Sequence, residues 1–252
     1  MGLDTRYQES LRQEFRHVMR IPVGAAHEGD LRDALHSLLD KLLNHPLSKR
    51  DTFLQTMTRA ALLRLRALEF ALLRRKEEYR ATDSTYEIWE LCEDLAAAAD
   101  VLLAPLGRKV TFTHPVDEGF LRTDKKVFRL MFLEAVCNAA LHTQGEEINI
   151  RLRLFSETAT LRFASAGTLD FEKLHGALQS GDGGAAAILR QTRLLGGSVL
   201  WTQDGAEAVC ALRLPVESTG KATISWLGAE DFTAMLLDRL SPVYVALSPV
   251  AL

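Results

Sequence analysis

The sequence of 252 residues has few cysteines, no long apolar run and no excess of positive charge. Cys92, Cys137 and Cys210 are scattered, which fits neither a CxxC metal site nor a disulfide framework, so we expect reduced thiols. No stretch approaches the roughly 18 uncharged apolar residues of a membrane span. The charged N-terminal residues also contain no apolar segment typical of a secretory signal. These absences predict a cytoplasmic protein with no membrane span.

The charge balance excludes a further class of partner. Lysine and arginine number 30 against 33 aspartate and glutamate residues, which gives a formal net charge of −3. Proteins that bind nucleic-acid phosphates usually carry a basic excess, so we expect no nucleic acid as partner. Apolar residues make up 47% of the chain and charged residues 25%, which is typical of a globular protein and excludes a disordered or fibrous chain.

The first 80 residues have the apolar periodicity of helices. Apolar side chains recur at spacings of three and four in two stretches: Leu11, Phe15, Val18, Met19, Leu31, Leu35, Leu38, Leu39 and Leu42, and then Leu54, Met57, Ala61, Leu65, Leu68 and Leu72. Residues 44–51 indicate a turn between two long helices, and Pro22 indicates a kink in the first. Such a hairpin exposes more apolar surface than two helices cover, so we expect a homodimer with a four-helix bundle. The alternative is that the stripe packs on the C-terminal half of the same chain.

Residues 81–86 break this pattern, and alternating elements follow. We expect helices over 86–104, 124–141 and 181–195, and strands over 109–114, 148–155, 158–164, 198–203 and 206–216. The fold class is therefore α+β, with a helical hairpin followed by a sandwich that has helices on one face of a mixed sheet. The predicted domains are 1–82, 83–216 and a C-terminal extension, 217–252. In that extension we expect a short helix over 230–240 and a strand or apolar strip over 242–247. We expect this apolar extension to cover the sheet edge or an empty pocket of the second domain.

Three groups of residues are candidates for chemistry. Glu134 and Asn138 lie four apart on one helix face, where an acid and an amide can hold Mg²⁺ against a triphosphate, although an ordinary exposed polar pair is the alternative. Gly181, Gly183 and Gly184 open a helix whose free backbone N–H groups favour phosphate, unless they form only a flexible loop. Taken alone, a helix histidine such as His17 is most often a surface or packed residue.

In this order, however, the segments resemble the histidine kinase catalytic core, a histidine-bearing dimerisation hairpin followed by a Bergerat-type ATPase domain. Residues 15–22, FRHVMRIP, resemble the phosphoacceptor box, with His17, Arg20 and Pro22 at matching positions. Residues 123–143 resemble the N box, which implies a catalytic role for Glu134 and a metal- and nucleotide-binding role for Asn138. Residues 181–199 resemble the second glycine box. The resemblance covers roughly residues 10–216 and implies ATP and Mg²⁺ as cofactors if the pocket is functional.

Two departures from the family pattern concern the histidine. The residue after it is usually acidic and orients the imidazole, but this position is Val18. Four residues after it, relatives with phosphatase activity need Thr or Asn to hold a water, and this position is Ile21.

Further departures concern the nucleotide site. The first glycine box corresponds to residues 163–170, where Ser165 replaces the adenine-binding Asp, Gly167 is retained and Leu169 replaces the second glycine. A serine in place of the carboxylate costs about 1–3 kcal/mol of binding. The lid between Gly167 and Gly181 is short and contains an amphipathic helix. Residues 185–187 are alanines and Asp182 adds a negative charge at the second box.

These departures together predict a histidine kinase-like, two-component signalling protein with impaired ATP binding. We expect a dimer that acts as a phosphotransfer or regulatory partner of a response-regulator receiver domain, with His17 and Arg20 carrying the chemistry. One alternative is an active ATP-dependent kinase that is autophosphorylated on His17. The other is a non-catalytic interaction scaffold, in which His17 is structural.

Overall fold

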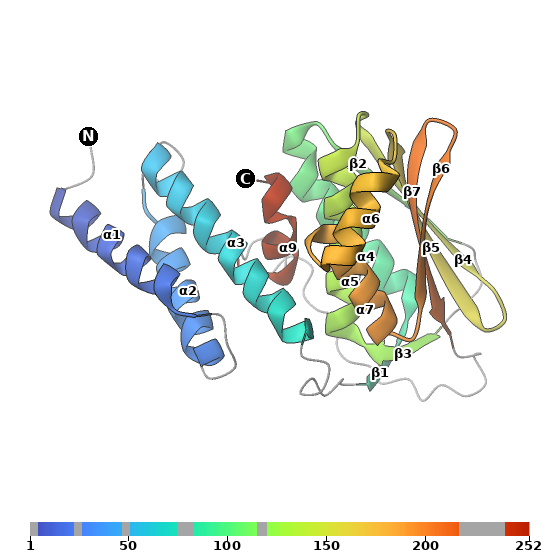
Figure 1. Cartoon of the computed structure of the whole chain (residues 1–252), viewed down its shortest axis with the longest axis horizontal. Helices are drawn as coiled ribbons and strands as arrows, with labels where there is room; N and C mark the ends of the chain where they lie inside the picture. Colours follow the sequence, from blue (N-terminus) through green and yellow to red (C-terminus); the bar gives the residue numbers. More distant parts are fainter. Residues whose placement is uncertain are drawn as a thin grey trace. The chain divides into compact units, whose positions relative to one another are not determined.

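The computed structural model describes residues 5–22, 27–46, 51–74, 83–114, 120–216 and 240–251. The chain divides into two compact units, residues 1–77 and residues 78–251. Figure 1 colours the chain along its sequence, so that the first unit runs from blue to cyan. None of the helices in the described ranges combines the length and the apolarity that crossing a membrane requires.

Within its described residues the first unit has three helices, α1 (Thr5–Arg20), α2 (Glu28–Leu43) and α3 (Thr52–Arg74). The interruption expected as a kink at Pro22 is a complete break, because α1 already ends at Arg20 and α2 begins only at Glu28. A proline disfavours the helical conformation of the residue before it and has no N–H to donate. α2 ends and α3 begins on either side of the expected turn, of which residues 47–50 lie outside the described residues. The Asp51 carboxylate accepts hydrogen bonds from the backbone of Phe53 at 2.9 Å and Leu54 at 3.2 Å. The first unit therefore contains one helix more than the predicted hairpin.

The α2 part of the apolar stripe and the matching residues of α3 are buried within a single chain, whereas Phe15 and Met19 on α1 are half-buried. The leucines of the stripe on α2 are fully buried, as are their counterparts on α3: Leu31, Leu35, Leu38, Leu39, Leu42, Leu54 and Leu62. An uncovered stripe was the reason for expecting a second copy. The dimer therefore stays a prediction that needs other support.

The second unit is built on a five-stranded mixed sheet. Its strands are β2 (Lys109–Thr113), β4 (Glu147–Leu154), β5 (Thr158–Ala166), β6 (Ser198–Asp204) and β7 (Glu207–Pro215). They lie in the order β2-β4-β5-β7-β6, with β2 and β4 parallel and the other neighbours antiparallel. The helices α4 (Ile88–Leu103), α5 (Lys125–His142) and α7 (Gly183–Leu194) lie on one face of this sheet (Figure 1). The α+β class and the sandwich predicted from the alternating elements are confirmed.

A second, two-stranded sheet was not predicted. It pairs β1 (Asp83–Glu87) with β3 (Phe120–Asp124) in antiparallel register. β1 occupies most of the segment expected to separate the domains and takes the first two residues of the predicted helix over 86–104. Neither DSTYE nor FLRTD alternates apolar and polar residues as the predicted strands do, so the pairing of the two strands with each other leaves no clear pattern in the sequence.

The core between the sheet and the helices follows from the alternation along the strands. Apolar residues at every second position of β4 and β5 are buried: Ile148, Ile150, Leu152, Ala159, Leu161 and Phe163. Phe132 of α5 meets Phe163 edge to face with ring centroids 5.2 Å apart, an arrangement that aromatic pairs prefer. Burial of each such ring stabilises the fold by about 2–3 kcal/mol.

The C-terminal extension differs from the prediction. Residues 242–247, expected as a strand or apolar strip, belong to the helix α9 (Pro242–Ala251). This helix contacts α5 and α4, rather than the sheet edge or the pocket described below. Its valines have high intrinsic strand propensity, but packing of Val243, Ala246 and Leu247 against those two helices outweighs it. The helix expected over 230–240 lies, apart from Leu240, outside the described residues.

Candidate functional site

The acid and amide of α5 face the beginning of α7. Glu134 is 3% exposed, and Asn138, one helical turn later, is partly exposed. A Cβ atom added to Gly184 would lie 2.8 Å from Glu134 Oε1 and 3.0 Å from Asn138 Oδ1. The structure therefore brings together two of the sequence-predicted groups, the N-box pair and the second glycine box, in direct contact.

The glycines at the start of α7 have different reasons to be glycine. Gly181 ends the preceding helix with φ +74°, and Gly183 turns the chain into α7 with φ +83°, which are left-handed conformations that other residues disfavour. Gly184 has ordinary backbone angles, but the close approach of Glu134 and Asn138 leaves no room for a side chain. Arg190 of α7 donates a hydrogen bond to the Gly181 carbonyl and so secures the turn.

A pocket of about 340 Å³ lies beside this contact, between α5, α7 and the strands β5, β6 and β7. Its walls are largely apolar, with Phe163, Trp201 and Val209 from the sheet. Ser165, which is 5% exposed, is among the polar groups of the wall. Cys210 also lines it, and burial raises the pKa of this thiol to about 12, so it is protonated and unreactive at neutral pH. The volume is near the lower end of the range for small-molecule sites.

The remaining wall of the pocket is the lid, an ordered helix α6 (Phe171–Ser180). The lid helix expected between Gly167 and Gly181 is thus confirmed. Asp170 caps its N-terminus by accepting a hydrogen bond from the Lys173 backbone at 2.9 Å. Lys173 and Leu174 line the pocket, so the lid helix is part of the enclosure.

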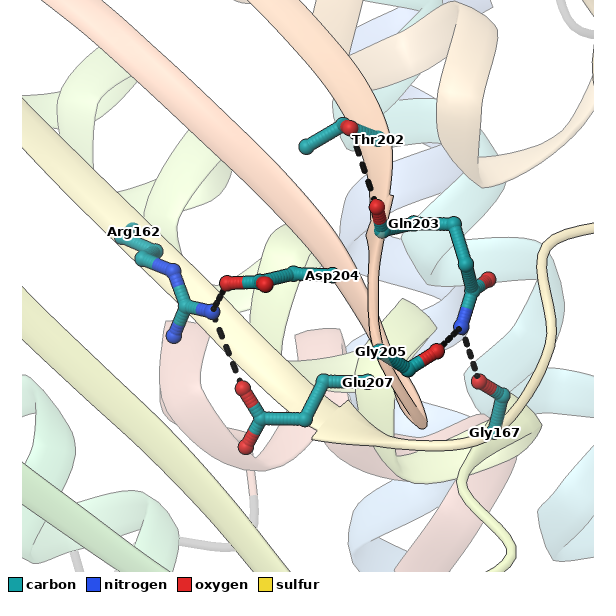
Figure 2. Close-up of polar contacts among 7 residues, drawn as sticks. All are labelled: Arg162, Gly167, Thr202, Gln203, Asp204, Gly205 and Glu207. Atoms are coloured by element: carbon teal, nitrogen blue, oxygen red, sulfur yellow. Dashed lines mark hydrogen bonds and ion pairs between the residues drawn. The ribbon is translucent and has the colours of Figure 1, made fainter.

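The start of the lid is held by the side chain of Gln203 at the end of β6. Its amide nitrogen donates to the carbonyl of Gly167 at 3.0 Å and to that of Gly205 at 2.9 Å (Figure 2). Its amide oxygen accepts from the Leu169 backbone at 2.8 Å. One side chain thereby fixes the segment that corresponds to the first glycine box to the β6–β7 turn.

The predicted site residues are distributed over three places. Asn138, Ser165, Gly183 and Gly184 line the pocket, and Glu134 faces Gly184. Gly167 and Gly181 lie at the two ends of the lid and are not among the lining residues. His17 and Arg20 are on α1, in the other unit.

Sequence reasoning missed Trp201, Lys173 and Gln203. Trp201 is paired with Cys210 and lies on the same face of the sheet as Phe163, so strand alternation could have assigned it to the pocket. Nothing in the sequence signals the role of Gln203, because its three hydrogen bonds depend on how the β6–β7 turn meets the lid.

His17 lies on the exposed side of α1, and the described residues supply no hydrogen bond to its ring. The next residue, Val18, is 2% exposed and points into the helical unit. An acidic side chain at this position would be buried away from water, which costs free energy unless it is paired. Glu14, one turn before His17, bonds Lys41 Nζ at 2.6 Å. Arg20 is exposed and three residues after His17, on the same side of the helix.

Glu134 and Asn138 offer the oxygen ligands that Mg²⁺ prefers. A side chain at position 184 would fill the space directly beside their oxygen atoms, and the glycine there keeps that space free. The described residues contain no cluster of three or more His, Cys, Asp or Glu side chains that could hold a metal. The apolar part of the pocket, by contrast, has room for a flat ring.

Comparison with known proteins places the fold. No protein-family model matches the sequence, and no curated protein does. Among solved structures, full-length ShkA in complex with AMPPNP matches with a TM-score of 0.61 and 16% identity, over 77% of this chain and 46% of ShkA. The Acinetobacter baumannii histidine kinase AdeS matches with a TM-score of 0.53 and 13% identity, over 76% of this chain and 98% of that one. The chain thus has the fold of the histidine kinase catalytic core and spans less than half of ShkA.

Proposed function

We propose that the protein is a phosphotransfer protein of two-component signalling, in which His17 carries the phosphoryl group and ATP is not the donor. The observation that supports the proposal is the contrast between a solvent-exposed His17 and a buried Glu134, which lies with Asn138 close to Gly184. The fold of the histidine kinase catalytic core supports the signalling role. The donor and acceptor are aspartates of response-regulator receiver domains, and the active form is a homodimer.

The transfer itself needs few groups from this chain. An imidazole nitrogen of His17 attacks the phosphorus of an aspartyl phosphate, and the new N–P bond forms as the P–O bond to the aspartate breaks. The aspartate leaves as a carboxylate, and the second ring nitrogen keeps its proton. Arg20, one turn away, neutralises the phosphoryl oxygens by charge-assisted hydrogen bonds. The reverse sequence passes the group to a second receiver.

In this proposal the second unit has a regulatory or docking role. Its pocket has an apolar part beneath the lid helix, and the N-box pair lies close to the start of α7. An ATP-dependent kinase is the alternative that the preserved meeting of Glu134, Asn138 and the glycine box favours. It requires α7 to move away from α5 when nucleotide binds.

The decisive experiment is transfer of labelled phosphate from a phosphorylated receiver domain to the purified protein. We expect labelling of the wild type and complete loss in His17→Gln, because no other nitrogen replaces the acceptor. His27→Gln is the matched control, since His27 is also exposed and its side chain makes no capping hydrogen bond. Labelling from Mg·ATP alone would establish the kinase instead. If neither donor labels the wild type, the protein is a scaffold.

A further inference from the structure

The face of the sheet turned away from α4, α5 and α7 is not covered by any described helix of the second unit (Figure 1). Residues paired across neighbouring strands point to the same face, so the strand register defines what this open face presents. One cross-strand row consists of Thr113, Arg151, Arg162, Ala211 and Leu200. The next row consists of Arg153, Thr160, Arg213 and Ser198.

These rows concentrate positive charge in a chain whose net charge is negative. Arg151, Arg153 and Arg213 are exposed, and none forms an ion pair with a residue in the described ranges. Arg162 is different, because its Nη2 contacts Asp204 Oδ2 and Glu207 Oε2, both at 2.9 Å (Figure 2). One arginine of this face thus already pairs with two carboxylates of the same chain, and its three neighbours remain available for carboxylates of a partner.

The open face also has shape and hydrogen-bonding groups. A shallow trough of about 660 Å³ runs across it, lined by Arg151, Arg153, Arg162 and by hydroxyl and amide side chains. Thr111 and Asn149 belong to that lining and share a hydrogen bond of 2.7 Å. At the β6 end of the first row Leu200 is 63% exposed, which is high for a leucine.

The composition of the face distinguishes between two polyanionic partners. Single-stranded nucleic acids bind on aromatic side chains that stack their bases, and the trough lining contains no aromatic residue among those described. Asp204 and Glu207 lie in the same lining and repel a continuous phosphate backbone. A polypeptide has separate carboxylates, which can meet the free arginines and avoid these two acids, and an apolar side chain for Leu200.

We propose that this open sheet face docks an acidic polypeptide segment, whose carboxylates pair with Arg151, Arg153 and Arg213 and whose apolar side chain covers Leu200. The contact is separate from His17 and from the pocket. It gives the second unit a binding role that does not depend on nucleotide.

The test measures binding of a fluorescein-labelled peptide of alternating glutamate and leucine to the full chain by fluorescence anisotropy. We expect Arg151→Glu to weaken binding about tenfold, because it removes an attraction and adds a repulsion. Arg193→Glu makes the same charge change at an exposed position on α7 and is expected to leave binding unchanged. Leu200→Ser, which leaves the charge as it is, is expected to weaken binding as well.

Three results would overturn the proposal. An equal loss of peptide binding in Arg151→Glu and Arg193→Glu would mean that only the overall charge of the protein matters. A single-stranded oligonucleotide that competes better than the peptide would assign the face to nucleic acid. Self-association in sedimentation that Arg151→Glu abolishes would assign it to a second copy of this chain. Circular dichroism of each variant checks that the fold is intact.

Discussion

The two units differ in how far their candidate functional side chains are exposed to solvent. On α1, His17 and Arg20 are exposed, and Val18 beside them is packed. In the second unit, Glu134 is buried, and Asn138 lies with it against Gly184. A phosphotransfer histidine needs only access and one cation, whereas a nucleotide site needs several groups and an open space at once. We therefore expect substitutions to impair a nucleotide site sooner than a phosphotransfer histidine.

The largest change in stability is expected at Val18, where the first unit departs from the family pattern. Val18→Glu restores the acid after the histidine, but it places a charge at a position that is 2% exposed. We expect it to destabilise the chain by about 3 kcal/mol rather than to create kinase activity. Urea denaturation followed by circular dichroism measures the change. Gln13→Glu is the control because Gln13 is exposed on the same helix, and equal stability of the two variants would refute the burial of Val18.

A smaller change in stability is expected for a substitution in the lid helix. Gly176 lies within α6 with open space around its Cβ position and without a left-handed backbone. We expect Gly176→Ala to stabilise the helix by about 0.5–1 kcal/mol and to slow hydrogen exchange of its amides.

Gly183 provides the matched comparison for the lid. It also has open space, but its φ is +83°. Gly183→Ala should therefore destabilise the chain by about 1–2 kcal/mol, since alanine disfavours the left-handed backbone conformation that position 183 has and position 176 lacks. Slower exchange in both variants would contradict the proposed difference between them.

The smallest expected difference is between the binding free energies of Mg·ATP and adenosine in the pocket. If the phosphate end is closed, the phosphates of ATP contribute nothing, and Mg·ATP should bind no more tightly than adenosine in calorimetry. The free energies should agree within about 0.5 kcal/mol, against the 1.4 kcal/mol that a tenfold preference represents. A magnesium-dependent preference for ATP beyond tenfold would show that α7 opens and would restore the kinase.

The sequence predicts those parts of the molecule in which local pattern and tertiary packing agree. The alternation over 148–155 and 158–164 and the helix over 124–141 correspond to β4, β5 and α5, because each buries one side against the same core. The pattern fails where a distant partner decides the structure. β1 and β3 depend on each other, and α9 is helical because α4 and α5 receive its apolar side. The Gln203 contacts and the closeness of Gly184 to Glu134 depend on a tertiary geometry that spacing alone does not contain.

The β6–β7 turn links the two faces of the sheet. Consecutive residues of a strand point to opposite sides, so Gln203 reaches the lid while Asp204 reaches Arg162 (Figure 2). A partner carboxylate that replaced Asp204 at Arg162 would act on the same turn that positions Gln203 against the lid. We therefore expect binding at the open face to change the stability of the lid hydrogen bonds, and any such effect is equal in both directions.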